Sequence, residues 1–205
     1  MAKIKLTKSE LKKQRDGLEQ FSHYLPTLQL KKQQLQIKIF EIRRSLHEKQ
    51  LEFDSLEGDI DQWVGLLSDP GINIEKWIVP KNIETSIHNI AGADIPVFEK
   101  VDFEKEDYDF YTMPFWVDQA TESISKFFSL LIEIEIIKKQ IEILQKELMT
   151  TTQRVNLFEK VKIPECLENI RKIRIYLGDQ QSNAVGVSKV AKKKIEQAVL
   201  AEMGT

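Results

Sequence analysis

The chain has almost none of the residues from which small catalytic or metal-binding sites are usually built. Its 205 residues include one cysteine, Cys166, and three histidines, His23, His47 and His88. It contains no glycine-rich phosphate loop, no Cys-x-x-Cys pair and no His-Glu-x-x-His motif. Because the histidines are also far apart in the sequence, we expect no metal site, no cofactor and no active site in this chain.

A single cysteine excludes an internal disulfide bond, which agrees with a reducing compartment such as the cytoplasm. Cys166 lies beside a row of apolar residues, and we interpret it as a small packed side chain rather than as a nucleophile. Residues 1–13 lack the apolar core of a signal peptide.

The chain also lacks a strong charge of either sign and a hydrophobic run of membrane-spanning length. Its most apolar stretch, 127–137, carries Glu133 and Glu135 and is too short to cross a bilayer. The net charge at pH 7 is −2, so bulk electrostatics gives no general attraction to nucleic acid or to anionic lipid. We therefore expect a cytoplasmic protein that does not insert into a membrane and does not bind nucleic acid, but that can belong to a complex on a membrane.

What the sequence has in abundance is a hydrophobic stripe with the seven-residue repeat of a coiled coil. From Leu11 to Leu67 the stripe positions recur every three or four residues, and fourteen of the seventeen are Leu, Ile, Phe or Trp. A seam kept for eight heptads faces another helix rather than a compact core, and its helix would be a rod of roughly 85 Å. The helix should begin at a capping box formed by Thr7 and Glu10, and end at the breaker cluster 68–71.

A second stripe of the same kind runs through the C-terminal half, in a helix that should begin near 112–115. It occupies positions 127–158, where the Ile and Glu residues of 132–136 also alternate with period two, as in a strand. We interpret this segment as helix because the 3–4 spacing continues on both sides of it.

The second stripe slips in phase after position 158. It resumes at Leu167, Ile170, Ile173 and Leu177. Gly178 and the polar residues 179–183 then interrupt it, which predicts a separate short helix over 188–202.

The two stripes pair most simply as an antiparallel hairpin, so we expect a mainly α fold with a long two-helix coiled coil. In the simplest register Pro26 lies opposite Phe158, and Pro164 lies opposite Gln20. Each proline removes a helix hydrogen bond, so both should bend the coiled coil locally. The residues expected to form its seam include Leu28, Leu35, Ile39, Ile42, Leu46, Ile134, Ile137, Ile141, Leu148 and Val155.

Three polar residues, Gln14, Lys32 and Lys49, occupy positions of the first stripe. Their polar ends either reach past the seam into solvent or fix the register of the two helices at some cost in stability.

The middle of the chain has a different pattern. Isoleucine and valine residues recur on both sides of 91–94, a segment that contains Gly92, and this predicts a β-hairpin that includes Ile87 and Ile95. Pro96 restricts the second run to an edge strand. We expect a small cap at the loop end of the coiled coil. The expected organisation is one structural unit with an N-terminal helix 1–70, a hairpin cap 71–112, a C-terminal helix 113–178 and a basic tail 179–205.

Charge is unevenly distributed along the chain. Residues 1–15 hold six Lys or Arg against one Glu, and Lys189 with 192–194 adds four more lysines. Antiparallel pairing would bring both groups toward one tip, whereas 99–109, with six Asp or Glu against two Lys, would lie at the other end. These charges either solvate the two ends or direct them to different partners.

Two segments carry a more specific signal. The first is Leu6-Thr7-Lys8-Ser9-Glu10-Leu11, followed by Leu28-Gln29-Leu30-Lys31-Lys32; the second is Arg154-Val155-Asn156-Leu157-Phe158-Glu159, followed by Ile163-Pro164 and Ile170-Arg171-x-Ile173. Together they resemble the D subunits of V-type and A-type ATPases, whose second motif reads Arg-Val-Asn-x-Leu-Glu … Ile-Pro … Ile-Arg-x-Ile. The family has leucine where this chain has Phe158, and a Lys-Arg pair where this chain has Lys31-Lys32. Over 178–186 the family has a strongly charged helical run, which this chain lacks.

The resemblance implies a central rotor shaft of a rotary ATPase or ATP synthase, which is not itself catalytic. Its termini would lie in the ring of catalytic A and B subunits, and its loop end would meet the small F subunit and the C- or d-type subunit on the membrane ring. The subunit would be monomeric when isolated and present as one copy per complex. It would couple ATP synthesis or hydrolysis to proton or sodium transport. Candidate contacts with the ring are Lys8, Lys12, Lys13, Arg154, Asn156, Lys192, Lys193 and Lys194.

Two other functions are compatible with the residues alone. A coiled-coil scaffold or tether without a motor would predict a parallel homodimer. A helical appendage of a nucleic-acid enzyme would predict salt-sensitive binding through Lys192, Lys193 and Lys194.

Overall fold

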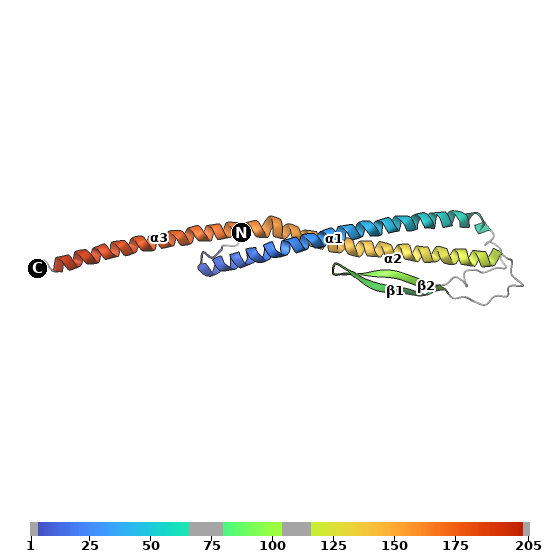
Figure 1. Ribbon diagram of the computed structural model, residues 1–205, viewed down its shortest axis with the longest axis horizontal. Helices are drawn as coiled ribbons and strands as arrows, with labels where there is room; N and C mark the ends of the chain where they lie inside the picture. Colours follow the sequence, from blue (N-terminus) through green and yellow to red (C-terminus); the bar gives the residue numbers. More distant parts are fainter. Residues whose placement is uncertain (1–3, 66–79, 104–115, 203–205) are drawn as a thin grey trace. The chain divides into compact units, whose positions relative to one another are not determined.

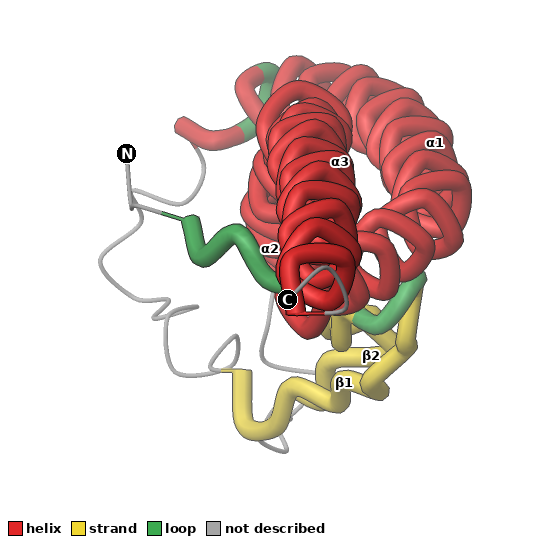
Figure 2. Tube along the Cα trace, turned by 90° about the vertical axis from the view of Figure 1, so that its left-hand side faces the viewer, coloured by secondary structure: helices red, strands yellow, loops and turns green. Residues whose placement is uncertain are grey.

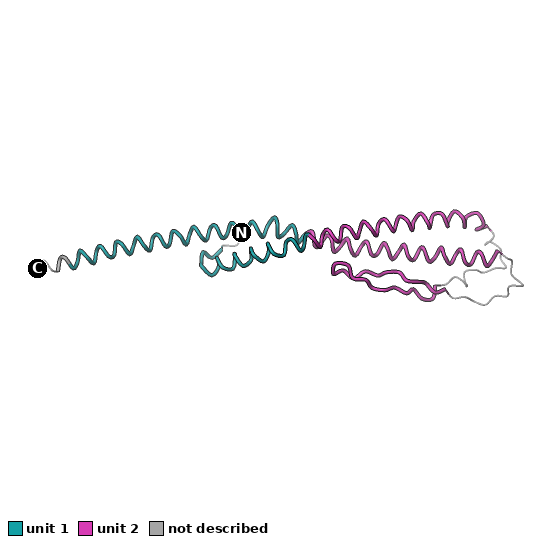
Figure 3. The backbone as a smooth tube through the Cα atoms, viewed as in Figure 1, with its two compact units in different colours: residues 1–29, 153–205 teal, residues 30–152 magenta. Residues whose placement is uncertain are grey.

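A computed structural model describes residues 4–65, 80–103 and 116–202. In chain order the elements are α1 (Lys8–Asp61), β1 (Pro80–Ile90), β2 (Ala93–Phe103), α2 (Trp116–Leu157), the π-helix η3 (Phe158–Lys162) and α3 (Ile163–Glu202), as labelled in Figure 1. The chain divides into two compact units: unit 1 comprises 1–29 with 153–205, and unit 2 comprises 30–152 (Figure 3). The mainly α fold with a central hairpin is confirmed.

Helix α1 begins where the capping residues predict. The backbone N–H of Glu10 donates to Thr7 Oγ1 at 3.3 Å, so Thr7 satisfies one of the free donors of the first turn. A capping box has a second hydrogen bond, from the Thr7 N–H to the Glu10 carboxylate. Here the Thr7 N–H donates to the Lys5 carbonyl instead, and Glu10 Oε1 accepts from Gln14 Nε2. The helix continues without a break through Pro26, as the stripe across it indicates.

Helix α1 ends at Asp61, earlier than the expected stop at 68–71, which lies outside the described residues. Gly58 weakens the last turns, and Asp59 and Asp61 place negative charge at the negative end of the helix dipole. The last turn of α1 contains no basic residue to offset this effect.

In unit 2, α1 and α2 are antiparallel and lie side by side (Figures 1 and 2). Lys31 contacts Glu147, Lys49 contacts Glu133, and the rings of Phe53 and Phe127 stack with centroids 4.5 Å apart. Every predicted position of the first stripe from 32 to 63 is buried or half-buried. The segment 132–136 is helix, as its flanking periodicity predicted.

The strands β1 and β2 form a two-stranded antiparallel sheet joined by a two-residue turn, Ala91-Gly92. Both turn residues have positive φ, 51° for Ala91 and 81° for Gly92, the combination that a tight hairpin turn of type I′ requires. The Asn89 side chain supports the turn by accepting a bond from the Gly92 N–H at 3.0 Å. The hairpin prediction is therefore confirmed, with a turn two residues shorter than expected.

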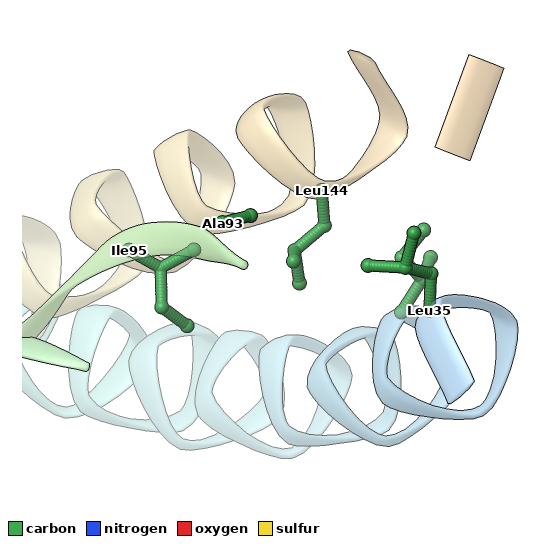
Figure 4. Close-up of a cluster of buried hydrophobic side chains, with 5 residues drawn as sticks. Leu35, Ala93, Ile95 and Leu144 are labelled. Atoms are coloured by element: carbon green, nitrogen blue, oxygen red, sulfur yellow. The ribbon is translucent and has the colours of Figure 1, made fainter. Parts of the chain in front are cut away.

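The hairpin is not confined to the loop end of the helices. Its turn-proximal residues Ala93 and Ile95 are buried against Leu35 and Ile39 of α1 and Leu144 of α2, in the cluster shown in Figure 4. The inner side of the hairpin, with Ile95 only 2% exposed, is apolar and packs along the helices, so the hairpin extends beyond the loop end at which a cap was expected. A second cluster around Ala120 joins the ends of α1, β2 and α2 through Trp63, Phe103, Trp116 and Ile124.

In unit 1 the junction before Pro164 is a π-helix. The N–H of Ile163 donates to the Phe158 carbonyl, five residues earlier, so this hydrogen bond of η3 spans one residue more than in an α-helix. Pro164 has no N–H and its ring crowds the preceding turn, which the wider turn accommodates. The extra residue also explains the phase slip: Cys166 is buried, whereas Leu167, which we expected in the seam, is 52% exposed.

Helix α3 runs without interruption from Ile163 to Glu202. The expected break at Gly178 and the separate helix over 188–202 are therefore not found. A glycine in a helix interior costs only about 1 kcal/mol relative to alanine, and no proline follows within the helix to enforce a stop. Beyond Leu177 the described side chains of α3, as far as Val199, are exposed.

Candidate functional site

The apolar seam of unit 2 is buried between the two helices. Leu35 and Leu144 are fully buried, and Ile39, Ile134, Ile137 and Ile141 are each less than 10% exposed. Ile42, Leu46 and Leu148 are half-buried at its edges. In unit 1, Val155 is buried and Leu28 half-buried. All ten predicted seam residues thus lie on inward-facing positions.

Two ion pairs bridge the two helices of unit 2 beside the buried seam. Lys31 Nζ lies 2.6 Å from Glu147 Oε1, and Lys49 Nζ lies 3.1 Å from Glu133 Oε2. Lys49 also contacts Glu52 on its own helix at 3.3 Å. Partial burial acts to lower the pKa of Lys49, but hydrogen bonds and attraction from Glu133 and Glu52 outweigh it and raise the pKa above its ordinary value. The ammonium group is therefore held charged between the helices.

A buried amide joins the hairpin to α2. Gln140, 8% exposed, donates from Nε2 to the carbonyl oxygen of Pro96 at 2.6 Å. Beside the turn, the ammonium of Lys31 lies 3.7 Å from the position that a Cβ on Gly92 would occupy. Ile95 is thus placed inside and Gly92 beside Lys31, whereas Ile87 on the outer side is 75% exposed.

In unit 1 the helices meet through small and aromatic residues. The rings of Phe21 and Phe158 have centroids 5.0 Å apart, and Asn169 Nδ2 donates to Gln14 Oε1 at 3.3 Å. The contact of Gln14 follows the expected register to within a residue. Phe158 instead meets Phe21, five positions before Pro26. The Lys31–Glu147 pair of unit 2 departs from the expected register by a similar amount. The prolines Pro26 and Pro164 both lie on exposed positions of this unit.

Cys166 lies inside unit 1, 7% exposed, with its Sγ 4.0 Å from the place that a Cβ on Gly17 would take. Burial, followed by the nearby charge of Glu165, raises the pKa of its thiol, and Lys162 opposes this shift. A thiol held protonated in an apolar contact is a poor nucleophile, as the sequence indicated.

The polar residues that the resemblance singles out all project into solvent. Lys8, Lys12, Lys13, Arg154, Asn156, Lys192, Lys193 and Lys194 are exposed in unit 1. They do not form one cluster. Leu177 is the last half-buried residue among the described side chains of α3, and Lys193 lies sixteen residues further along the helix. At 1.5 Å per residue this is about 24 Å. Antiparallel pairing was expected to bring both basic groups toward one tip; the continuous helix α3 instead carries Lys193 along the helix beyond Leu177.

Sequence reasoning missed Lys31, Gln140 and η3. Lys31 and Gln140 flank stripe positions, and opposite charges at such flanking positions are the signal that could have identified the Lys31–Glu147 pair. Within the ranges that the structure describes, no three His, Cys, Asp or Glu residues are grouped as metal ligands. None of the described helices combines the length and apolarity needed to span a bilayer.

The chain matches the family model for the D subunit of ATP synthase over residues 10–193. It is 47% identical over 195 residues to the V-type ATP synthase D subunit of Borreliella burgdorferi, a match that covers 95% of this chain and 96% of the relative. It is 32% identical to the V-type ATP synthase D subunits of Chlamydia muridarum, over 96% of this chain and 98% of that relative, and of Chlamydia pneumoniae, over 94% and 93%. The chain therefore belongs to the family of ATP synthase D subunits.

Proposed function

We propose that this chain is the central-stalk rotor subunit of a V-type ATP synthase. It transmits rotation between the catalytic ring and the ion-translocating ring in the membrane, and so couples ATP synthesis or hydrolysis to the transport of protons or sodium ions. A subunit of an ATP synthase is one component of a multi-subunit complex, and in this role the chain performs no ATP chemistry itself.

The observation that carries the proposal is that one chain fills its own seam. The stripe of α1 in unit 2 is covered by α2 of the same chain, with Leu35 and Leu144 fully buried. Because close-packed interiors resist deformation, such a helix pair transmits a twist rather than absorbing it. A tether formed by a parallel homodimer would instead leave the seam of each chain for its partner.

Bridges between the helices suit the same mechanical role. Sliding α1 along α2 would separate Lys49 from Glu133 and Lys31 from Glu147. These contacts therefore favour one register of the helix pair. Fixing the register is one of the two roles considered for Lys49 as a polar residue of the stripe.

The distal part of α3 has the surface of a segment that other subunits enclose. Val187 is 70% exposed, Val190 58% and Ile195 64%, and Lys192, Lys193 and Lys194 lie among them. Exposed apolar side chains gathered on one segment are atypical of a free surface and mark contacts with other proteins. We assign this segment, with Lys8, Lys12 and Lys13 on α1 and with Arg154 and Asn156, to contact with the catalytic A and B subunits.

The loop end of unit 2, at the cluster around Ala120, meets the other partners in this proposal, the small F subunit and the C- or d-type subunit. Rotation of an asymmetric stalk presents a different face to each catalytic site in turn and shifts each site among states of different nucleotide affinity. Nucleotide binding and rotation are then coupled reciprocally.

A photoreactive residue at position 193 tests this role in the assembled complex. The tagged full-length chain is purified with its ATP synthase, and irradiation joins position 193 to an A or B subunit. We expect ATP hydrolysis to fall in proportion to the crosslinked fraction, because a fixed rotor blocks turnover. An unirradiated sample is the control. Hydrolysis that persists in fully crosslinked complexes would identify a static scaffold instead.

A further inference from the structure

The π-helix η3 takes up one residue that the 3–4 repeat of unit 1 does not need. If the helix continued as α past Phe158, the repeat would place three charged residues on inward positions. These residues are Lys162, Glu165 and Lys172. With the extra residue held in η3, the inward positions are instead buried or half-buried apolar residues, namely Ile163, Cys166, Ile170 and Ile173.

Packing of the seam alone does not account for this extra residue. A chain without one residue of 159–162 would keep Ile163 and Cys166 inward on an unbroken α-helix, because the 3–4 spacing from Phe158 would then be regular. Single π turns within α-helices are frequent at functional sites. The extra residue is therefore a candidate for a role in motion rather than in packing.

Side chains pack thinly around η3. Val155 and Cys166 are buried, but no side chain from 156 to 165 is. In α2 of unit 2, by contrast, a buried side chain recurs at least every four residues between 130 and 144. A segment with few buried apolar contacts opens or deforms at low cost in free energy.

The stretch of α1 that contacts η3 is weakened as well. Phe21, whose ring packs on Phe158, lies between Gly17 and Pro26. A glycine costs a helix about 1 kcal/mol relative to alanine, and Pro26 has no N–H to donate to the preceding turn. Pro164 likewise removes a donor directly after η3. Both helices thus lose backbone support in the same part of unit 1.

We propose that η3 and residues 17–26 of α1, here named the twist joint, form the section in which the stalk deforms elastically when torque acts along it. A backbone N–H in a π turn can exchange between the carbonyls four and five residues earlier, which changes the local twist while the helix stays intact. The close-packed seam of unit 2 transmits the torque. The inference rests on the proposed function, since only a rotor carries torque.

Deletion of Lys160 tests the joint, because it removes the extra residue and leaves the seam residues inward. Lys160→Ala is the matched control, since it removes the same exposed side chain but keeps the length of the turn. Hydrogen exchange of the isolated full-length chains, followed by mass spectrometry, measures local opening. In the wild type and the control, we expect amides of 156–166 to exchange about a hundredfold faster than amides of 134–144. The deletion should slow the exchange of 156–166 about tenfold.

Equal exchange of 156–166 in the deletion variant and the wild type would overturn the inference. A deletion variant that loses helicity would overturn it too, because packing would then require the extra residue. Pro26→Ala tests the other helix independently. It changes an exposed position and restores an N–H donor, so exchange of 17–26 should slow while that of 134–144 stays the same. Unchanged exchange of 17–26 would remove α1 from the joint and contradict the proposal.

The role of the joint in the complex is read from a bead attached to the loop end of the stalk, with the catalytic ring immobilised. Without ATP, we expect the variance of the bead angle to be about twofold smaller for the Lys160 deletion than for the wild type and Lys160→Ala, because a stiffer stalk fluctuates less. Equal variances would overturn the inference and leave the proposed function intact. A wild-type complex whose bead does not rotate when ATP is added would overturn both.

Discussion

At the scale of single residues, two isoleucines of α1 show that position on the helix determines burial. Ile39 is 6% exposed and packs in the seam, whereas Ile37, on the other side of the same helix, is 58% exposed. Both are equally apolar, so composition alone does not separate them. Their place relative to the 3–4 repeat does, and the repeat predicted Ile39 as the buried one.

We predict that Ile39→Asp destabilises the isolated chain by about 3 kcal/mol or more, because it buries a carboxylate without a partner. Ile37→Asp is the matched control, and its free energy of unfolding should change by about 0.5 kcal/mol or less, as is usual for exposed sites. Urea unfolding followed by circular dichroism measures both. Equal losses in the two variants would mean that Ile39 is not in a buried seam.

The raised pKa of Lys49 predicts a dependence of stability on pH. The folded state holds this proton more tightly than the unfolded state, so the contribution of Lys49 is complete below its ordinary pKa of about 10.5. It is lost as the pH rises through the higher pKa of the folded state. The difference in free energy of unfolding between wild type and Lys49→Met should therefore be constant from pH 7 to pH 9 and shrink above it. A difference that grows at alkaline pH would contradict the bridge to Glu133.

At the scale of elements, hydrophobic periodicity predicted the helices and the side they bury, because one repeat determines both. The hairpin followed from alternating isoleucines around Gly92. The π-helix could not be predicted, since α and π turns differ by one residue and the choice depends on how Pro164 packs. The docking of the hairpin on Leu35 and Leu144 also escaped prediction, because an alternating pattern shows which side of a strand is apolar but not what it packs against.

Two glycines should respond with opposite sign to the same substitution. Gly92→Ala places a side chain at φ 81° and should destabilise the hairpin by about 1 kcal/mol. Gly178→Ala lies within α3, where a Cβ would meet nothing within 4 Å, and should stabilise the helix by about 0.5–1 kcal/mol. Thermal unfolding of both variants measures the two effects. A destabilised Gly178→Ala chain would contradict a continuous α3.

At the scale of the whole molecule, the chain combines features that suit a mechanical subunit. Unit 2 holds a self-filled seam crossed by ion pairs, and unit 1 carries a helix whose distal third is exposed and apolar on part of its surface. The sequence indicated the seam and the family. It did not indicate that α3 continues past Gly178. One glycine among good helix formers interrupts a helix only weakly, and the sequence pattern overstates its effect.

In the proposed function, this chain turns while the catalytic ring stays fixed. A gold bead attached to the stalk of a complex immobilised through its catalytic subunits makes the motion visible under the microscope when ATP is added. We predict stepwise rotation in one direction, at a rate that follows ATP hydrolysis. A complex that hydrolyses ATP at its normal rate while the bead remains stationary would contradict it.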